Sequence, residues 1–348
     1  MNTSMKAGVR GLSFSLLLLT VPASGLFCST AAAAGAVTPM DQLMIKRGYT
    51  PVPVRPSQPN RLFVSVKING RTTACLIDTG APELIIDSLR AGGLKHIGKT
   101  ATPAYGLLGR YASDLQIVQV DRVEVAGVGF TNQEAVVSNL HRETRAKTGS
   151  YIPTSSEGNP TDAVIGMSLL RNMHAWLDCF APRLYVRLET PEAALKENME
   201  RSFQASGFVT VPVRALGSKL FAETAINGQP ATFMIDTGSF ASFIALDQLD
   251  AFHLSNQEQL GNFIDIGGRK TDLKYTRPES FKLGAFELKR YPLGTVHLPL
   301  LTEHNDQFKK HDLPPLVGLI GPDVLEKSAA LIDCEGGRMF LMAKTAEK

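Results

Sequence analysis

The sequence predicts an all-β protein whose two similar lobes are related by an approximate twofold axis. Three observations lead to this prediction: the chain repeats itself, each copy consists mostly of short strands, and helical segments are few. The clearest repeat pairs LFVSVKINGRTTACLIDTG at residues 62–80 with LFAETAINGQPATFMIDTG at residues 220–238, which lie 158 residues apart. Internal similarity at a fixed spacing indicates a duplicated structural unit.

Two later pairs of segments continue the repeat. VEVAGVGF at residues 123–130 matches FKLGAFEL at 281–288. AVIGMSLLRNMHAWLDC at 163–179 matches GLIGPDVLEKSAALIDC at 318–334, now 155 residues apart. Because three segments keep nearly the same spacing, we interpret the chain as a duplicated domain.

Each copy has the pattern of a strand, a tight turn and a returning strand. Apolar residues alternate with polar ones in LFVSVKI and LFAETAI, which is typical of strands with one buried face. An Asn-Gly pair follows each run, at 69–70 and 227–228, and predicts a hairpin turn. The returning strands are apolar until they reach Asp78 and Asp236.

Short helices are expected at about 167–173, 191–202 and 322–328. The middle one is polar and lies between the copies, as a linker would. The predicted division of the chain is a signal peptide at 1–34, an N-terminal extension at 35–59, an N-terminal lobe at 60–189, a linker helix at 190–206 and a C-terminal lobe at 207–344.

The N-terminus has the features of a secretion signal. Two basic residues precede a short apolar run at 12–21, and alanines at 31–34 supply a cleavage site. The alternative is an uncleaved anchor, but the run is shorter than the roughly 20 residues of a membrane span. Lipid attachment at Cys28 is disfavoured by the bulky Phe27. We therefore expect an exported protein, periplasmic or extracellular, with no stable membrane insertion after cleavage.

The net charge of +3 includes Lys6 and Arg10 of the leader, so the mature chain carries about +1. Such a balanced charge argues against a nucleic-acid partner or an anionic membrane surface.

After cleavage three cysteines remain, Cys75, Cys179 and Cys334, so the protein is not a disulfide framework. Cys179 and Cys334 take equivalent positions in the repeat. A disulfide between them is conceivable, but free thiols buried in strands are the commoner outcome. Cys75 lies on a predicted core strand, so its expected role is packing.

The two Asp-Thr-Gly sequences predict one site rather than two turns. A single copy is a common turn sequence. Equivalent residues of two lobes, however, meet near the axis that relates the lobes. Asp78 and Asp236 are then close enough to share one proton. The ionised member can take a proton from water while the protonated member donates to a carbonyl oxygen, a scheme that needs neither a metal nor a covalent intermediate.

The residues beside each acid suit this arrangement. Gly80 and Gly238 permit a close approach that a side chain would block. Thr79 and Thr237 are short and hydroxylated, so they can hydrogen-bond across the lobes. The residue after each glycine differs, and the Ser239 hydroxyl is expected to stabilise the charged form of Asp236, although the protonated member is left open.

These motifs resemble those of the retropepsin and pepsin superfamily of aspartic peptidases. The resemblance is carried by Asp-Thr-Gly-Ala at 78–81, Asp-Thr-Gly-Ser at 236–239 and the apolar-apolar-Gly segments that end at Gly166 and Gly321. It covers about 280 of the 348 residues and implies a bilobal acid-protease fold, two retropepsin-like β-barrel lobes related by a pseudo-twofold axis. It further implies that Gly166 and Gly321 support the active-site turns.

Each copy also contains a candidate flap. Glycine-rich hairpin tips can close over an extended peptide. The candidate residues are Tyr105, Gly106, Gly109, Gly267 and Gly268. Ordinary hairpin turns are the alternative. Two polar segments, at 141–162 and 301–315, are either solvated insertions or parts of the substrate groove.

The sequence therefore predicts an aspartic endopeptidase, with peptide or protein as its substrate, no cofactor and no metal site, acting as a monomer with an internal pseudo-dimer. The seven histidines show no metal-ligand spacing, and no Gly-x-Ser-x-Gly sequence supports a serine nucleophile. The alternatives are a silent peptide-binding protein and an envelope-assembly protein of the same fold.

Overall fold

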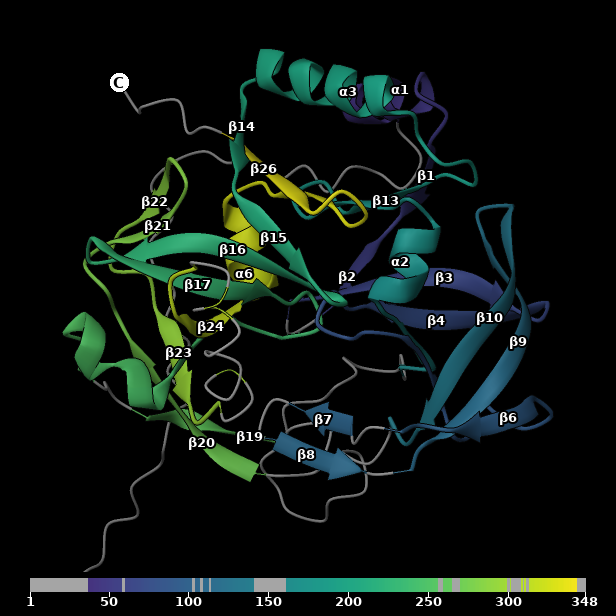
Figure 1. Ribbon diagram of the computed structural model, residues 1–348, viewed down its shortest axis with the longest axis horizontal. Coiled ribbons are helices and arrows are strands. Elements are labelled where there is room, and N and C mark those ends of the chain that lie inside the picture. The colour runs from purple at the N-terminus through teal and green to yellow at the C-terminus, as the bar shows by residue number, and fades with distance from the viewer. Residues whose placement is uncertain are drawn as a thin grey trace, which may run out of the picture. The chain divides into compact units, whose positions relative to one another are not determined.

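The structure is a computed structural model, and from Val37 onward the chain forms one compact unit (Figure 1). The residues that it describes are 37–57, 60–101, 104–106, 109–112, 114–140, 161–255, 259–264, 270–298, 301, 308, 310 and 313–342. The predicted leader lies outside them. None of the helices in these ranges is long and apolar enough to cross a membrane.

The first lobe is an eight-stranded sheet in the order β2-β3-β4-β11-β5-β10-β9-β6, and β3 also pairs with β9. The second pairing closes a ring of strands, so the sheet is barrel-like. Its strands are β2 (Arg55–Ser57), β3 (Arg61–Ile68), β4 (Arg71–Ile77), β5 (Leu84–Asp87), β6 (Lys95–Lys99), β9 (Gln116–Val125), β10 (Val128–Ser138) and β11 (Ala163–Ile165). A separate hairpin joins β7 (Ala104–Gly106) and β8 (Gly109–Ala112).

The second lobe is a ten-stranded sheet with the path β19-β20-β23-β18-β24-β17-β16-β21-β22, and β15 pairs with β16. It repeats the parallel pairings of the first lobe, because β17–β24 corresponds to β4–β11 and β18–β23 to β5–β10. Its strands are β15 (Val213–Leu216), β16 (Lys219–Ile226), β17 (Gln229–Ile235), β18 (Phe243–Ala245), β19 (Gln259–Ile264), β20 (Lys270–Thr276), β21 (Phe281–Leu283), β22 (Phe286–Leu288), β23 (Leu293–Val296) and β24 (Leu316–Ile320). The predicted duplication is confirmed.

A third, six-stranded sheet joins the two halves of the chain. Its order is β1-β13-β12-β25-β26-β14, so each half contributes three strands and the halves meet at β12–β25. The order is symmetric, because β1, β12 and β13 correspond in the repeat to β14, β25 and β26. The strands are β1 (Thr50–Pro53), β12 (Trp176–Asp178), β13 (Arg183–Val186), β14 (Phe208–Val211), β25 (Leu331–Asp333) and β26 (Arg338–Met342).

The helices α1 (Pro39–Ile45) and α3 (Ala193–Ala205) pack on this sheet, and Figure 1 shows them side by side at the top of the view. They share one apolar cluster with the sheet, made of Met44, Tyr49, Trp176, Tyr185, Met199, Phe203, Leu331 and Phe340. Because β1 corresponds to β14, the repeat begins earlier than residue 62. The signal was present in the sequence as Val-Pro-Val-Arg at 52–55 and again at 211–214.

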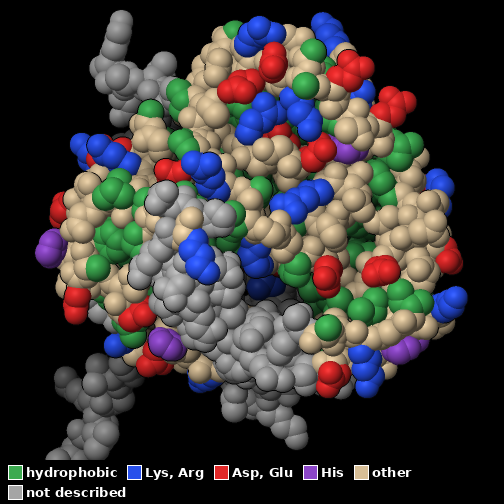
Figure 2. All heavy atoms as spheres, viewed as in Figure 1, with side chains coloured by type: hydrophobic (Ala, Val, Ile, Leu, Met, Phe, Trp, Pro, Cys, Tyr) green, Lys and Arg blue, Asp and Glu red, His purple; other side chains and the backbone are tan. Residues whose placement is uncertain are grey.

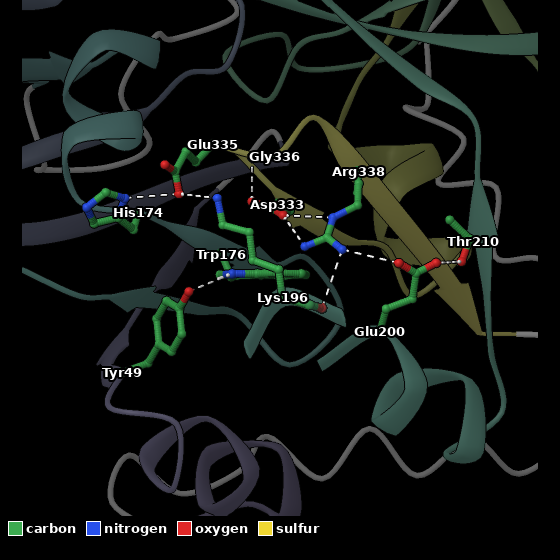
Figure 3. A network of polar contacts seen from close by, with 10 residues as sticks. All are labelled: Tyr49, His174, Trp176, Lys196, Glu200, Thr210, Asp333, Glu335, Gly336 and Arg338. Atoms are coloured by element: carbon green, nitrogen blue, oxygen red, sulfur yellow. Dashed lines mark hydrogen bonds and ion pairs between the residues drawn. The ribbon is translucent and has the colours of Figure 1, made fainter. Parts of the chain in front are cut away.

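Ion pairs fasten α3 to the same sheet (Figure 3). Arg338 Nη1 on β26 lies 3.2 Å from Glu200 Oε2 of α3. Lys196 Nζ, also on α3, lies 3.2 Å from Glu335 Oε2, and His174 Nδ1 reaches that same oxygen at 3.0 Å. Glu335, from the second half of the chain, therefore contacts both the connecting helix and His174 of the first half.

The three predicted helices are confirmed as α2 (Met167–Asn172), α3 and α6 (Pro322–Lys327). The short 3-10 helices η2 (Leu246–Gln248) and η3 (Asp250–Phe252) and the helix α1 were not predicted. α1 begins at a capping box in which Thr38 and Asp41 exchange hydrogen bonds, a pattern that the sequence analysis missed.

The cysteines Cys75, Cys179 and Cys334 are buried and free. The disulfide that we considered between Cys179 and Cys334 does not form. Cys179 donates its N–H to Ala330 and Cys334 to Ala175, so the two lie at opposite ends of the β12–β25 pairing. That separation, four residues along a strand at about 3.3 Å each, exceeds the roughly 7 Å that a disulfide can bridge.

Candidate active site

The two acids stand at equivalent ends of the two lobes' central strands. Asp78 directly follows β4, and Asp236 directly follows β17. The N–H of Asp78 donates to the carbonyl of Ile165 at 3.0 Å, and the N–H of Asp236 donates to that of Ile320 at 2.9 Å. The strands β11 and β24 therefore fix where each acid leaves its sheet.

The two turns are held together by a reciprocal exchange between their threonines. The hydroxyl of Thr79 donates to the carbonyl of Ile235 at 2.8 Å, and it accepts the N–H of Thr237 at 3.1 Å. Thr237 makes the matching bonds, to the carbonyl of Ile77 at 2.9 Å and from the N–H of Thr79 at 3.1 Å. Both threonines are fully buried. The predicted bonding across the lobes is confirmed.

Each glycine of the two turns lies against the acid of the other lobe. A Cβ added to Gly80 would lie 2.5 Å from Oδ1 of Asp236, and one added to Gly238 would lie 2.2 Å from Cγ of Asp78. Real Cβ atoms essentially never come this close. The absence of a side chain at both positions is what lets the two carboxyls meet.

In each turn one carboxylate oxygen accepts two backbone N–H groups, from the second and third residues after the acid. The distances are 2.7 and 3.0 Å at Asp78, and 3.0 and 3.1 Å at Asp236. These bonds orient both carboxyl groups and favour a negative charge on the pair.

The pair does not ionise fully near neutral pH. Burial and the neighbouring charge of Asp78 raise the pKa of Asp236 to about 7, and the two side chains share a hydrogen bond. The Lys219 ammonium and the N–H of Gly238 act in the opposite direction. Two interacting carboxyls of this kind carry one proton between them over a range of pH.

We expected the Ser239 hydroxyl to stabilise the charged form of Asp236, and this expectation is wrong. The hydroxyl donates to the carbonyl of Ala241 at 2.7 Å, and the Ser239 hydrogen bond to Asp236 comes from its backbone N–H. Burial and the neighbouring charge of Asp78 therefore outweigh the bonds that favour the charged form of Asp236.

Gly166 and Gly321 pack directly against the loops that follow the two acids. A Cβ at Gly166 would lie 2.2 Å from the carbonyl oxygen of Glu83, and one at Gly321 would lie 2.5 Å from that of Ala241. Glu83 and Ala241 are each five residues beyond their acid. The packing agrees with the supporting role that the resemblance implied for both glycines.

The second turn has a polar support that sequence reasoning missed. Ser242 Oγ accepts the N–H of Gly321 at 2.9 Å and donates to Asp323 Oδ1 at 2.7 Å. The Tyr291 hydroxyl donates to Asp323 Oδ2 at 3.2 Å. Leu84 holds the position of Ser242 in the first copy, and this difference between the copies was the available signal.

The candidate flaps are placed only in part. Gly106 and Gly109 lie opposite each other in the β7–β8 hairpin, and Tyr105 lies opposite Arg110. Gly267 and Gly268 lie outside the described residues, and so do most residues of the polar segments at 141–162 and 301–315. The flap function stays a prediction.

Within the described ranges, no group of three His, Cys, Asp or Glu side chains is arranged to hold a metal ion.

The comparisons with known proteins agree with this geometry. The family model described as aspartyl protease matches residues 64–169 and 222–321, more than half of the chain and both copies of the repeat. The chain therefore belongs to the aspartyl protease family. Its fold is the bilobal, mostly β, retropepsin-like one that the sequence predicted.

Two solved structures are similar to this chain at low identity. A retropepsin-like aspartic protease from Rickettsia conorii is 17% identical with a TM-score of 0.26, and the match covers 40% of this chain and 89% of that one. Basic 7S globulin from soybean is 11% identical with a TM-score of 0.41, and the match covers 85% of this chain and 95% of that one. No curated protein sequence matches the chain.

Proposed function

We propose that this chain is an aspartic endopeptidase that hydrolyses peptide bonds of an extended polypeptide with a water molecule activated by Asp78 and Asp236. The observation that carries the proposal is the packing of each turn's glycine against the opposite acid, because it brings the two carboxyls together. A raised pKa at Asp236 supplies the two protonation states that acid–base catalysis needs.

In the proposed reaction Asp78 is the base and Asp236 is the acid. The Asp78 carboxylate takes a proton from water as the water oxygen bonds to the scissile carbonyl carbon. Asp236 gives its proton to the carbonyl oxygen, which leaves a neutral tetrahedral diol. The proton on Asp78 then passes to the amide nitrogen as the C–N bond breaks. Asp236 recovers a proton from one hydroxyl, so the pair returns to its starting state.

The assignment extends to compartment and assembly. We infer export from the basic, apolar and alanine-rich segments of residues 1–34. We also infer that the chain works as a monomer, since its two copies supply both acids. A substrate of protein or peptide follows from the proposed reaction.

The test compares the wild type with Asp78→Asn and Asp236→Asn on a peptide library across pH. Each variant alone should lose about 10²- to 10⁴-fold in cleavage rate, the range typical of a lost acid–base group. Asp247→Asn, on the exposed surface of η2, is the matched control and should cleave like the wild type. Equal cleavage by all four proteins would remove both acids from the reaction. A wild type that binds library peptides but cuts none would favour the silent peptide-binding alternative.

A further inference from the structure

Lys219 brings a positive charge from the second lobe to the turn of the first. It is the first residue of β16, and its Nζ donates to the carbonyl oxygen of Gly80. Two residues earlier, the Gly217 carbonyl accepts a hydrogen bond from Arg171 Nη1 of α2 at 2.9 Å. The tip of the β15–β16 hairpin is therefore held on the first lobe at two points, and Figure 2 shows Lys and Arg side chains in a hollow on this face of the molecule.

The Gly80 carbonyl belongs to the residue that touches the opposite acid. A Cβ on Gly80 would lie within 2.9 Å of both carboxylate oxygens of Asp236. An ammonium group at that residue is consequently a near neighbour of the carboxyl pair. The charged side chains that act on Asp236 are Asp78, which favours its protonation, and Lys219, which opposes it.

A different interlobe contact lies near the other turn, two residues beyond Gly238. The amide of Asn60, at the start of the first copy's equivalent strand, donates to the carbonyl of Phe240 at 3.1 Å. Arg61 holds the repeat position of Lys219 and has contacts of its own.

We propose that Lys219 is a positioning residue that keeps the carboxyl pair singly ionised by holding a cation at the Gly80 carbonyl. The effect of Lys219 on cleavage rests on the proposed function, whereas its effect on the titration of the carboxyl pair does not. A fixed positive charge stabilises the carboxylate form, so it lowers both pKa values of the coupled pair. Without this charge, both deprotonation steps of the pair move to higher pH, and the bell-shaped profile of cleavage against pH moves with them.

The experiment reads the two carboxyls directly. The full chain is labelled with 13C at the aspartate carboxyls, and its NMR titration is recorded for the wild type, Lys219→Met, Lys219→Arg and Lys67→Met. Asp78→Asn and Asp236→Asn assign the two signals. Lys67→Met is the matched control, since Lys67 is an exposed cation of β3 that pairs with Glu124 at 3.2 Å. Lys219→Gln provides a second uncharged variant should Lys219→Met fold poorly.

Lys219→Met should raise both apparent pKa values of the pair by about one unit, as expected for the loss of a nearby opposite charge. Lys219→Arg and Lys67→Met should titrate like the wild type. An unchanged titration in Lys219→Met, or equal shifts in the Met and Arg variants, would overturn the proposal. The pH profile of cleavage is measured on the same proteins. If none of them cleaves but the titrations shift as described, the proposed function fails and the role of Lys219 stands.

Discussion

The two lobes place their acids with the same backbone but surround them with different side chains. In both, the acid leaves a strand with a parallel partner and packs against the other lobe's glycine. The first turn rests on apolar packing at Leu84 and receives the Lys219 ammonium. The second rests on Ser242 and Asp323. A symmetric backbone can therefore bring two carboxyls together, while asymmetric neighbours give each turn its own support.

The largest expected effect comes from breaking the feature that the lobes share. Gly80→Ala and Gly238→Ala each place a Cβ within 2.5 Å of the opposite carboxyl, so the two acids must separate. Each variant should lose about 10²-fold or more in cleavage rate, since both acids act together. The measurement is kcat/KM on one peptide. Gly98→Ala is the control, because a Cβ there meets nothing within 4 Å. A fully active Gly238→Ala would mean that the contact does not position the pair.

Changing the polar support of the second turn should lower the free energy of unfolding more than changing the equivalent apolar position of the first. Ser242→Ala removes two hydrogen bonds and leaves the buried N–H of Gly321 without this partner, at a cost of roughly 1–3 kcal/mol in the free energy of unfolding. Urea unfolding measures this loss. Leu84→Ile at the equivalent position keeps the volume of the side chain, so it should cost less than about 1.5 kcal/mol. Similar small losses in both variants would show that the polar support is dispensable.

The pH dependence of stability should report the proton that the two acids share. Because the folded-state pKa of Asp236 is raised to about 7, the folded state binds more protons than the unfolded state between about pH 4 and pH 7. This contribution to stability is present below pH 4 and is lost as the pH rises through 7. Asp236→Asn should flatten the fall that the wild type shows over this range, as measured by urea unfolding at several pH values. An unchanged slope in Asp236→Asn would contradict a proton shared by the pair.

The smallest effect is expected at the neutral contact between the lobes. Asn60→Ala removes one exposed hydrogen bond to Phe240 and no charge, so the free energy of unfolding should fall by about 0.5–1 kcal/mol. The carboxyl titration should not move, in contrast to that of Lys219→Met. Thermal unfolding and the NMR titration check the two statements. A shift in the titration of Asn60→Ala would mean that interlobe geometry, rather than charge, controls the pair.

The sequence by itself determined the duplicated β fold and the pair of acids. Both follow from local patterns: alternating strands, Asn-Gly turns and an Asp-Thr-Gly in each copy. Because a repeat brings equivalent positions together, the bonding of Thr79 to the other lobe could be predicted without coordinates. The two Val-Pro-Val-Arg segments mark the earlier start of the repeat. The positions around them differ between the copies, so this part of the repeat was not predicted.

Only the tertiary structure decided what surrounds the acids. Lys219 reaches Gly80, 139 residues away, and Ser242 reaches Asp323, 81 residues away, through contacts that no sequence spacing encodes. The raised pKa of Asp236 has the same origin, since burial and a neighbouring charge set it rather than the residue next in the chain. The expectation for Ser239 was wrong for this reason: a hydroxyl is free to turn toward whichever acceptor the fold supplies, here the carbonyl of Ala241.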